Sequence, residues 1–262
     1  QGTGLSSSAS LEVAVGLFLS LIGEVVLDAQ TIALVAQQAE NEFVGCQCGI
    51  MDQLASAAGL ANHCLLIDCL SLEVRPVPMP EELAIVIVNS NVRRGLVESA
   101  YNERRLQCEG AARALGVTSL REVDMAQLRA NESRIDPVQF RRARHVVSEN
   151  QRTSLMANAL TQGKLDDVGA LMARSHWSLN EDFEVTVPQL DLLVNLIEPT
   201  VRHVGGVRMT GGGFGGCVVV LAPIDRVDAV QRAVNDGYAQ QTGLVPDIYV
   251  CSASDGAGTL DI

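Results

Sequence analysis

The chain has 262 residues, of which 47% are hydrophobic and 19% charged, so it has enough apolar material for the cores of two domains. Its formal charge of −12 excludes a protein that coats nucleic acid, because phosphate backbones need clustered positive charge. No apolar run reaches the roughly 18 residues that a membrane helix needs, and the single lysine, Lys164, lacks the neighbours of a lysine-dependent phosphate loop.

Hydrophobic periodicity predicts helices, then strands, in the first third of the chain. Residues 7–22 predict a helix that is apolar nearly all round, so we expect it to be buried. Residues 28–43 predict an amphipathic helix, whose apolar face consists of Ile32, Val35, Ala36, Ala39 and Phe43. The elements expected next are a short helix around 50–58 and strands at 64–69, 72–77 and 83–90.

The rest of the chain is expected to be mostly helical until its last third. The predicted helices are 95–115, 137–162, 165–176 and 188–198. A strand at 205–210, a glycine turn at 211–216, a strand at 217–222, a helix at 226–241 and a strand at 246–252 follow. Because the helices form a block between groups of strands, we expect an α+β fold. The composition shift near residue 90 predicts two domains, 1–90 and 91–262.

The seven cysteines are scattered and odd in number, which is typical of reduced thiols in a cytoplasmic protein. A metal site would have to combine residues 46, 48, 63, 64 and 69. We disfavour it because the spacing of Cys46 and Cys48 is not that of a zinc pair and no second matching pair exists.

A serine-glycine loop runs directly into the first predicted helix. Its residues are Gly2, Thr3, Gly4, Leu5, Ser6, Ser7 and Ser8. Glycines let an anion approach the backbone, the first helical turn offers unpaired N–H groups, and hydroxyls bind phosphate oxygens or Mg²⁺. The alternative is ordinary N-capping by one serine, which leaves two further serines unexplained.

Two acidic residues are candidates for chemistry or for ordinary structure. Asp52 follows a glycine-containing loop and stands at the start of a short helix, where spacing alone favours a capping aspartate. Glu40 borders the apolar stripe of its helix, where a solvated polar face is the common alternative.

Four motifs together identify a resemblance that covers nearly the whole chain. They are GTGLSSSAS followed by LEVA (residues 2–14), ENEFVG to CGIMDQ (40–53), YNERRLQC (101–108) and RMTGGGFGGC (208–217). In this order they resemble the GHMP small-molecule kinases, and among these most closely the galactokinase family. The resemblance implies a two-domain GHMP kinase-like architecture and ATP-dependent phosphorylation of the C1 hydroxyl of galactose.

The resemblance also assigns roles to individual residues. It implies that residues 2–8 bind ATP, that Asp52 is the catalytic base, and that Ser8 and Glu40 bind Mg²⁺. Gly49, Asp52 and Tyr101 are implied to contact the sugar. On the residues alone, Tyr101 could equally be a half-buried helix residue, and its neighbours Arg104 and Arg105 could face solvent. Galactose and ATP are the expected partners, and oligomeric state is not readable from the sequence.

The glycine turn at 211–216 contains more glycine than a hairpin needs. We expect backbone there to approach another segment or a ligand closely, and the resemblance places this loop beside the active site. A dinucleotide-binding reading fails because a strand, not a helix, follows the turn. The basic run Arg141, Arg142 and Arg144 is expected on a solvated helix face.

Other functions remain possible at this point. A non-catalytic relative that senses galactose and ATP would often carry a damaged phosphate loop, whereas here GLSSSAS is unbroken and Asp52 is present. A GHMP kinase for another substrate, such as N-acetylgalactosamine, arabinose or a mevalonate-type compound, is the third reading. The YNERRLQC stretch favours galactose.

The sequence lacks one motif that the resemblance leads us to expect, similar to GRVNLIGEHxDY, with its phosphate-stabilising arginine and sugar-binding cluster. We therefore expect the N-terminal domain to be incomplete in this chain and the isolated chain to have little or no kinase activity. An assay of the purified 262 residues with ATP and galactose checks this expectation, and near-full turnover would contradict it.

Overall fold

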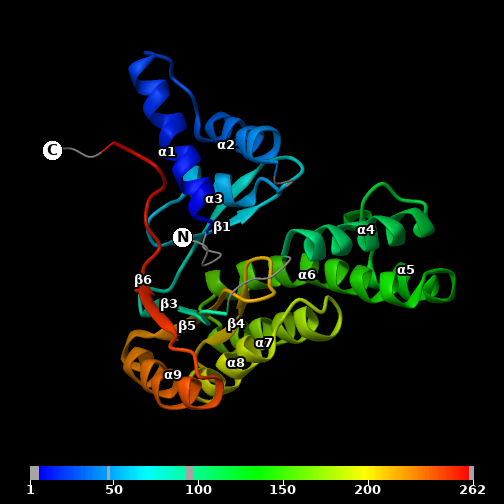
Figure 1. The fold of residues 1–262 in the computed structure, drawn as a ribbon, viewed down its shortest axis with the longest axis vertical. Helices are drawn as coiled ribbons and strands as arrows, with labels where there is room; N and C mark the ends of the chain where they lie inside the picture. The colour runs from blue at the N-terminus through cyan, green and yellow to red at the C-terminus, as the bar shows by residue number, and fades with distance from the viewer. Residues whose placement is uncertain (1–5, 46–47, 93–96, 260–262) are drawn as a thin grey trace. The chain divides into compact units, whose positions relative to one another are not determined.

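The computed structural model describes residues 6–45, 48–92 and 97–259 (Figure 1). The chain divides into two compact units, one formed by residues 1–81 with 251–262 and the other by residues 82–250. The first unit contains α1 (Ser7–Ile22), α2 (Ala29–Ala39), a π-helical turn (Glu40–Val44), α3 (Met51–Ala58), β1 (His63–Ile67) and β2 (Val74–Pro78).

Helix α1 has the bounds that the sequence predicts, but the expectation that it is buried all round is wrong. Val13 is fully buried and packs with Ile32 and Ala36 of α2. Leu11 and Phe18, in contrast, are 65% and 58% exposed. In the described part of the first unit, α1 packs against α2 and α3, and these two helices cover only one of its faces.

The buried face of α2 also differs from the predicted stripe. Ile32, Ala33 and Ala36 are buried, whereas Val35 and Phe43 are exposed. For Phe43 the difference arises because α-helical geometry gives way to π-helical geometry at Glu40, which rotates the following residues away from the α-helical stripe. As a result Glu40, not Phe43, is the last buried residue on this side.

The C-terminal segment completes the first unit by hydrogen bonding to the end of α3 and the loop after it. The Asn62 N–H donates to the Ala253 carbonyl at 3.1 Å, and the Gly256 N–H donates to the Gly59 carbonyl at 2.9 Å. A side chain on Gly59 would lie 2.8 Å from the Gly256 nitrogen, so glycine is required there for backbone to meet backbone. The small antiparallel sheet of β1 and β2 follows this junction.

The second unit carries a four-stranded sheet and most of the helices. Its elements are β3 (Leu83–Asn89), α4 (Val97–Leu115), α5 (Met125–Ala130), α6 (Pro137–Thr161), α7 (Leu165–Glu181), α8 (Pro188–Val201), β4 (Gly206–Thr210), β5 (Cys217–Pro223), α9 (Val227–Thr242) and β6 (Asp247–Cys251). The strand order is β4-β5-β3-β6, and β5 pairs antiparallel with both β3 and β4. The mixture of elements confirms the α+β class.

The division into units differs from the predicted boundary near residue 90. Strand β3 lies before that boundary in the sequence, yet it pairs with β5 along its whole length, with Val86 opposite Val220. Strand pairing therefore assigns residues 82–90 to the second unit. This pairing joins segments about 130 residues apart, and no local composition signal reports it.

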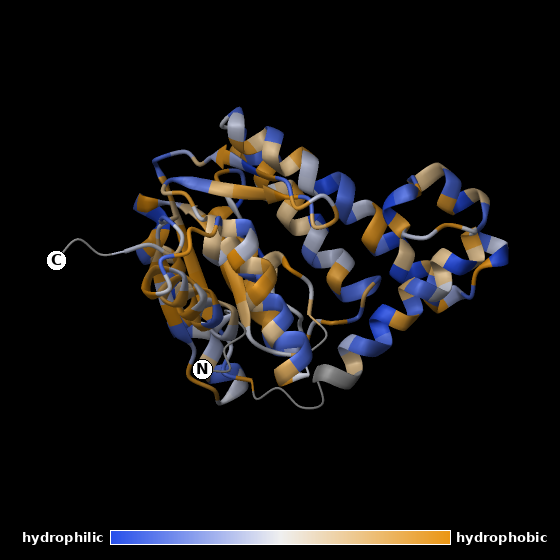
Figure 2. Cartoon of the chain, turned by 90° about the horizontal axis from the view of Figure 1, so that it is seen from above, coloured by the Kyte–Doolittle hydropathy of each residue, from blue (hydrophilic) through white to orange (hydrophobic). Residues whose placement is uncertain are grey.

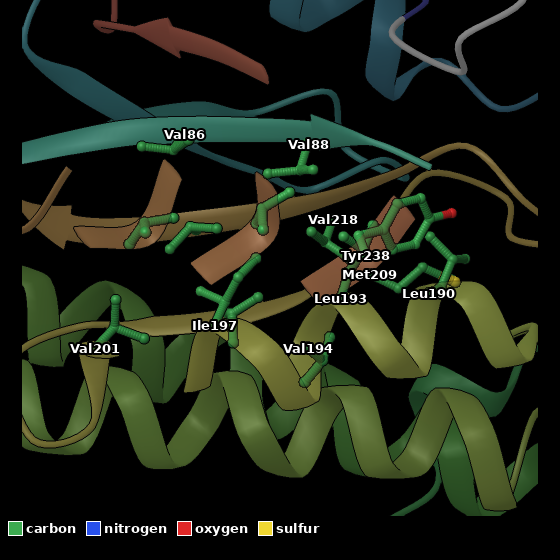
Figure 3. Packing of buried hydrophobic residues seen from close by; sticks show 14 of the residues in the cluster. Val86, Val88, Leu190, Leu193, Val194, Ile197, Val201, Met209, Val218 and Tyr238 are labelled. Atoms are coloured by element: carbon green, nitrogen blue, oxygen red, sulfur yellow. The ribbon is translucent and has the colours of Figure 1, made fainter. Parts of the chain in front are cut away.

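The main core lies between this sheet and helices α8 and α9 (Figure 3). The sheet contributes Val86, Val88 and Val218, all fully buried. Leu193 of α8 and Tyr238 of α9 are buried against them. The Tyr238 hydroxyl donates to the Ser90 carbonyl at 2.7 Å, so the one polar atom of this side chain has a partner.

A smaller core holds α4, α5 and α6 together, with hydrophobic and hydrophilic residues alternating around these helices (Figure 2). Helix α6 begins where Asp136 accepts from the N–H groups of Val138 and Gln139, with Pro137 in the first turn. The sequence predicts a helix over 137–162, which α6 confirms, and misses the short helix α5. No helix among the described residues is long and apolar enough to span a membrane.

The main core generates a stability prediction. Leu193→Ala should lower the free energy of unfolding by about 3 kcal/mol, because a fully buried leucine leaves a cavity that the sheet cannot fill. Urea unfolding measures the change. Leu155→Ala on the exposed side of α6 is the control and should change stability by under about 1 kcal/mol. Equal losses in the two variants would contradict the assignment of Leu193 to the main core.

Candidate functional site

The N-terminus of α1 is left uncapped by side chains in the described residues. Ser6 is the N-cap residue, adopts a left-handed backbone with φ of 51°, and makes no side-chain capping hydrogen bond. Ser7 and Ser8 follow it in the first turn and are exposed. Free N–H groups, exposed hydroxyls and the positive end of the helix dipole are the features that suit the binding of an anion. The ordinary capping alternative is therefore not realised. Gly2, Thr3, Gly4 and Leu5 lie outside the described residues.

One turn along α1, a partly buried polar cluster begins at Glu12. Ser8 and Glu12 are four residues apart, so they share a face of the helix. Glu12 hydrogen-bonds to the Glu40 side chain, and the Gln53 amide nitrogen donates to Glu12 Oε2 at 3.4 Å. The cluster thus joins α1, the end of α2 and α3. The sequence signal that could have found Glu12 is its position one turn after Ser8.

Burial and carboxylate contact control the charge of this cluster. Glu40 is 8% exposed and Gln53 is 1% exposed. Burial, together with the hydrogen bond and like charge of Glu40, raises the pKa of Glu12 to about 7. The Glu40 Oε2 atom is buried without a hydrogen-bond partner. An orphaned carboxylate oxygen is a hard donor of the kind that Mg²⁺ prefers, so Glu40 fits the predicted metal role chemically.

The loop before α3 is held from α2 and from the π-helical turn. The Gln37 amide donates to the Cys48 carbonyl at 3.2 Å, and the Cys48 N–H donates to the Asn41 side chain at 3.1 Å. Gly49 follows immediately and is exposed, with open space where a Cβ would stand. This anchoring fixes the backbone that leads into Asp52.

Asp52 lies in the first turn of α3 and is exposed. The N-cap residue of this helix is Ile50, which has no side-chain capping bond, so Asp52 is not the capping residue that spacing alone favoured. Its carboxylate is available to a ligand at the positive end of a helix dipole, which stabilises an anionic side chain. Asp52 follows Ser8 and Glu40 in the same unit, and its neighbour Gln53 contacts Glu12.

Tyr101 belongs to the second unit, on α4, where it is 45% exposed. The two arginines that follow it differ in environment. Arg105 is exposed as expected and pairs with Glu109. Arg104 is not, because its side chain is only 11% exposed and donates to the carbonyls of Phe183 and Glu184.

The glycine turn at 211–216 approaches backbone closely, as expected. A Cβ on Gly213, whose φ is +84°, would lie 2.3 Å from the Val185 carbonyl oxygen. The next residue, Phe214, donates its N–H to that oxygen at 2.7 Å. Only glycine allows this approach, so the turn is fastened to the segment before α8.

The basic run on α6 is not a solvated face. Arg142 is 2% exposed and donates to Gln107, to the Asp182 carbonyl and to the Glu184 carboxylate. Arg144 pairs with the buried Asp182 carboxylate. Sequence spacing missed these contacts because the acceptors lie about 40 residues away.

His145, Ser178 and Asp182 are linked by hydrogen bonds but do not form a hydrolase triad. The His145 ring lies 3.0 Å from the Ser178 oxygen, and that hydroxyl donates to Asp182 at 3.1 Å. The serine is therefore between the other two, whereas a triad needs histidine between serine and acid. All three side chains are buried, which keeps substrates out.

A cavity in the second unit lies apart from the predicted site residues. A cavity of about 540 Å³ is lined by α7, α8 and residues 201–207, and Trp177, which borders it, is 57% exposed. None of the predicted site residues lines this cavity. Among the described residues, no group of three or more His, Cys, Asp or Glu side chains could hold a metal. Cys46, one of the residues of the disfavoured cysteine-histidine site, lies outside the described residues.

Family models match both ends of the chain. Residues 1–60 match the N-terminal domain of GHMP kinases, and residues 156–240 match the C-terminal domain of GHMP kinases.

Individual relatives extend the match to nearly the whole chain. It is 55% identical to a galactokinase from Pasteurella multocida (strain Pm70), covering 97% of this chain and 66% of that protein. It resembles the crystal structure of Lactococcus lactis galactokinase complexed with galactose, with a TM-score of 0.93 and 36% identity over 99% of this chain and 68% of that one. Mevalonate kinase from L. major in complex with R-mevalonate shares the fold, with a TM-score of 0.66 and 20% identity over 97% and 67%. The chain thus spans about two thirds of these relatives' length.

The environment of His145 generates a pH prediction. Desolvation lowers the pKa of His145 to about 4, while Glu149 and Asp182 partly oppose this shift and Arg152 and Arg208 add to it. The unfolded chain, with a histidine pKa of about 6.5, therefore takes up a proton first as pH falls, and stability is lost between about pH 6.5 and pH 4.

When the pH falls from 7 to 5, the contribution of His145 should lower the free energy of unfolding of the wild-type protein by about 2 kcal/mol. Over the same pH range, the free energy of unfolding of His145→Gln should fall by about 2 kcal/mol less than that of wild type. Urea unfolding at both pH values measures the two changes. The exposed His203→Gln is the control and should follow wild type. Parallel curves for wild type and His145→Gln would contradict the prediction.

Proposed function

Because this chain belongs to the galactokinase family of the GHMP kinases, we propose that its site residues serve the ATP-dependent phosphorylation of the C1 hydroxyl of galactose. The products are galactose 1-phosphate and ADP. One observation carries the proposal: the first turn of α1 is uncapped and bears exposed serines, and Glu12, one turn further on, contacts the buried carboxylate of Glu40. This arrangement suits a triphosphate held without lysine.

We propose that residues 2–8 bind the phosphates of ATP. The described part of this loop supports the proposal, because Ser6 leaves the first-turn N–H groups of α1 without a side-chain acceptor. Phosphate oxygens are strong acceptors and complement these donors. The exposed hydroxyls of Ser7 and Ser8 add further donors.

Mg²⁺ is proposed to bind Ser8 and Glu40. Glu12 contacts Glu40 and shares a helix face with Ser8, and the Glu40 Oε2 atom is buried without a partner, which supports this donor pair. When bound, Mg²⁺ would neutralise charge on the phosphate oxygens. Within the protein, the contact of Glu12 with Gln53 links this carboxylate pair to the helix of Asp52.

Asp52 is proposed as the base. Its carboxylate takes the proton of the C1 hydroxyl while that oxygen forms a bond to the γ-phosphorus and the bond from this phosphorus to the β,γ-bridging oxygen breaks, releasing ADP. Its exposure and its freedom from a capping role support this. Gly49 offers an open backbone for the sugar, and Tyr101 is proposed as a further sugar contact.

A reducing compartment, the cytoplasm, is proposed as the site of action. Cys64, Cys108 and Cys251 have no disulfide partner. Burial raises the pKa of the Cys64 thiol and raises that of Cys108 to about 11, so both thiols stay protonated and unreactive.

Asp52→Asn in the native protein should lower kcat by about 10²–10⁴-fold, because an amide cannot accept the hydroxyl proton. Galactose-dependent ADP release measures kcat, and titration calorimetry with ATP should show affinity within about twofold of wild type. Asp228→Asn is a matched control, since Asp228 is an exposed acid in the first turn of α9. It should retain full turnover.

Unchanged turnover in Asp52→Asn would remove this residue from the mechanism. A wild-type protein that binds galactose and ATP but never releases ADP would instead favour a sensor. Faster turnover with N-acetylgalactosamine or arabinose than with galactose would change the proposed substrate.

A further inference from the structure

We propose that Arg104 is a positioning residue that fixes the glycine turn 211–216 relative to the helix that carries Tyr101. This inference rests on the proposed function, because the resemblance gives Tyr101 and the turn their roles. The link itself runs wholly within the second unit, through the short segment 182–185 between α7 and α8.

Arg104 holds the segment 182–185 from α4. Its Nε donates to the Phe183 carbonyl at 2.6 Å, and its Nη2 donates to the Glu184 carbonyl at 2.9 Å. These two carbonyls belong to consecutive residues, so one planar guanidinium satisfies both. Helix α4 and the segment are thereby held in one register.

Helix α6 holds the same segment from another direction. Arg142 donates to the Asp182 carbonyl at 2.6 Å and to the Glu184 carboxylate. Glu184 itself has a left-handed backbone, with φ of 53°, a conformation that a non-glycine residue adopts only when its surroundings enforce it. The segment therefore has little freedom to shift while its arginines are in place.

The segment in turn holds the glycine turn. The Val185 carbonyl accepts the Phe214 N–H at 2.7 Å, and Gly213 packs on the Val185 backbone where no Cβ would fit. The Arg104 guanidinium also lies 5.8 Å from the centroid of the Phe214 ring, within cation–π range. Arg104 thus contacts the turn directly and also through the segment.

Tyr101 is connected to this linkage through helix α4, because it lies three residues, or about one turn, before Arg104. Removing the Arg104 guanidinium would take away the hydrogen bonds that hold the segment from α4 and leave those from Arg142, and this would loosen the turn and the side of α4 from which Tyr101 projects. Arg105 provides a natural comparison. It is the adjacent residue of the same type, yet its side chain is 56% exposed and pairs only with Glu109 on its own helix.

The experiment compares Arg104→Met, Arg104→Lys and Arg105→Met with wild type in the native protein. Hydrogen exchange of the Phe214 amide reports directly on the turn. In Arg104→Met it should be at least about tenfold faster, because the segment that accepts this N–H loses two hydrogen bonds. Arg104→Lys keeps one charged donor, so the exchange rate of its Phe214 amide should lie between those of Arg104→Met and wild type. The rate in Arg105→Met should match that of wild type.

Kinetics supply the second readout. Arg104→Met should lower kcat by about 100-fold, the scale of a small misplacement near reacting groups, and should raise the KM for galactose more than that for ATP. A merely structural role would lower the melting temperature without this split. Partial recovery of kcat in Arg104→Lys is expected. Phe214→Leu, which removes only the ring, should accelerate exchange even if Arg104→Met does not fold.

Unchanged exchange at Phe214 in Arg104→Met and in Phe214→Leu would overturn the proposed linkage. Faster exchange with unchanged kcat and KM would overturn the role of the linkage in positioning the site. Absence of galactose-dependent turnover in the full-length wild-type protein would refute the proposed function, and the exchange measurement would still decide the linkage.

Discussion

An α-helix cannot satisfy the N–H groups of its own first turn, and in α1 the side chain of the N-cap residue does not satisfy them either. Ser6 occupies the N-cap with a left-handed backbone and leaves those donors open. The same constraint makes the N-terminus of α1 suitable for the anion site that we propose in a chain with one lysine. Glu12 lies one turn after Ser8 on α1 and hydrogen-bonds to Glu40, which follows α2, so a cation bound at Glu40 would also be close to Glu12.

Structural features that depend on a short stretch of sequence could be predicted. The bounds of α1 follow from its serines and apolar run, and the helix predicted over 137–162 is observed as α6. The glycine turn could be read as a place of close backbone approach, because five glycines exceed what a hairpin needs. These signals work because capping, turn geometry and hydrophobic period each depend on neighbours within one or two turns.

Features that depend on distant partners could not be predicted. Strand β3 joins the second unit because it pairs with β5. Arg104 and Arg142 look like solvent-facing residues until the segment 182–185 supplies their acceptors. The same holds within the candidate site: the position of Glu12 one turn after Ser8 is a weak signal, and its significance comes from Glu40 and Gln53, which other helices bring to it. Local sequence patterns therefore predict candidate residues, and tertiary contacts show which side chains surround them.

The return of residues 251–257 to the first unit has a consequence for the order in which the protein is assembled. Ala253 and Gly256 bond to Asn62 and Gly59, so the first unit is closed only by residues that follow the whole of the second unit in the chain. During synthesis, the backbone groups at the end of α3 therefore remain hydrogen-bonded to water until residues 82–250 have been made. The second unit is thus inserted between two parts of the first unit, and these two parts can pair only after the second unit has been made. A chain cut short before residue 253 would have a first unit without these hydrogen bonds.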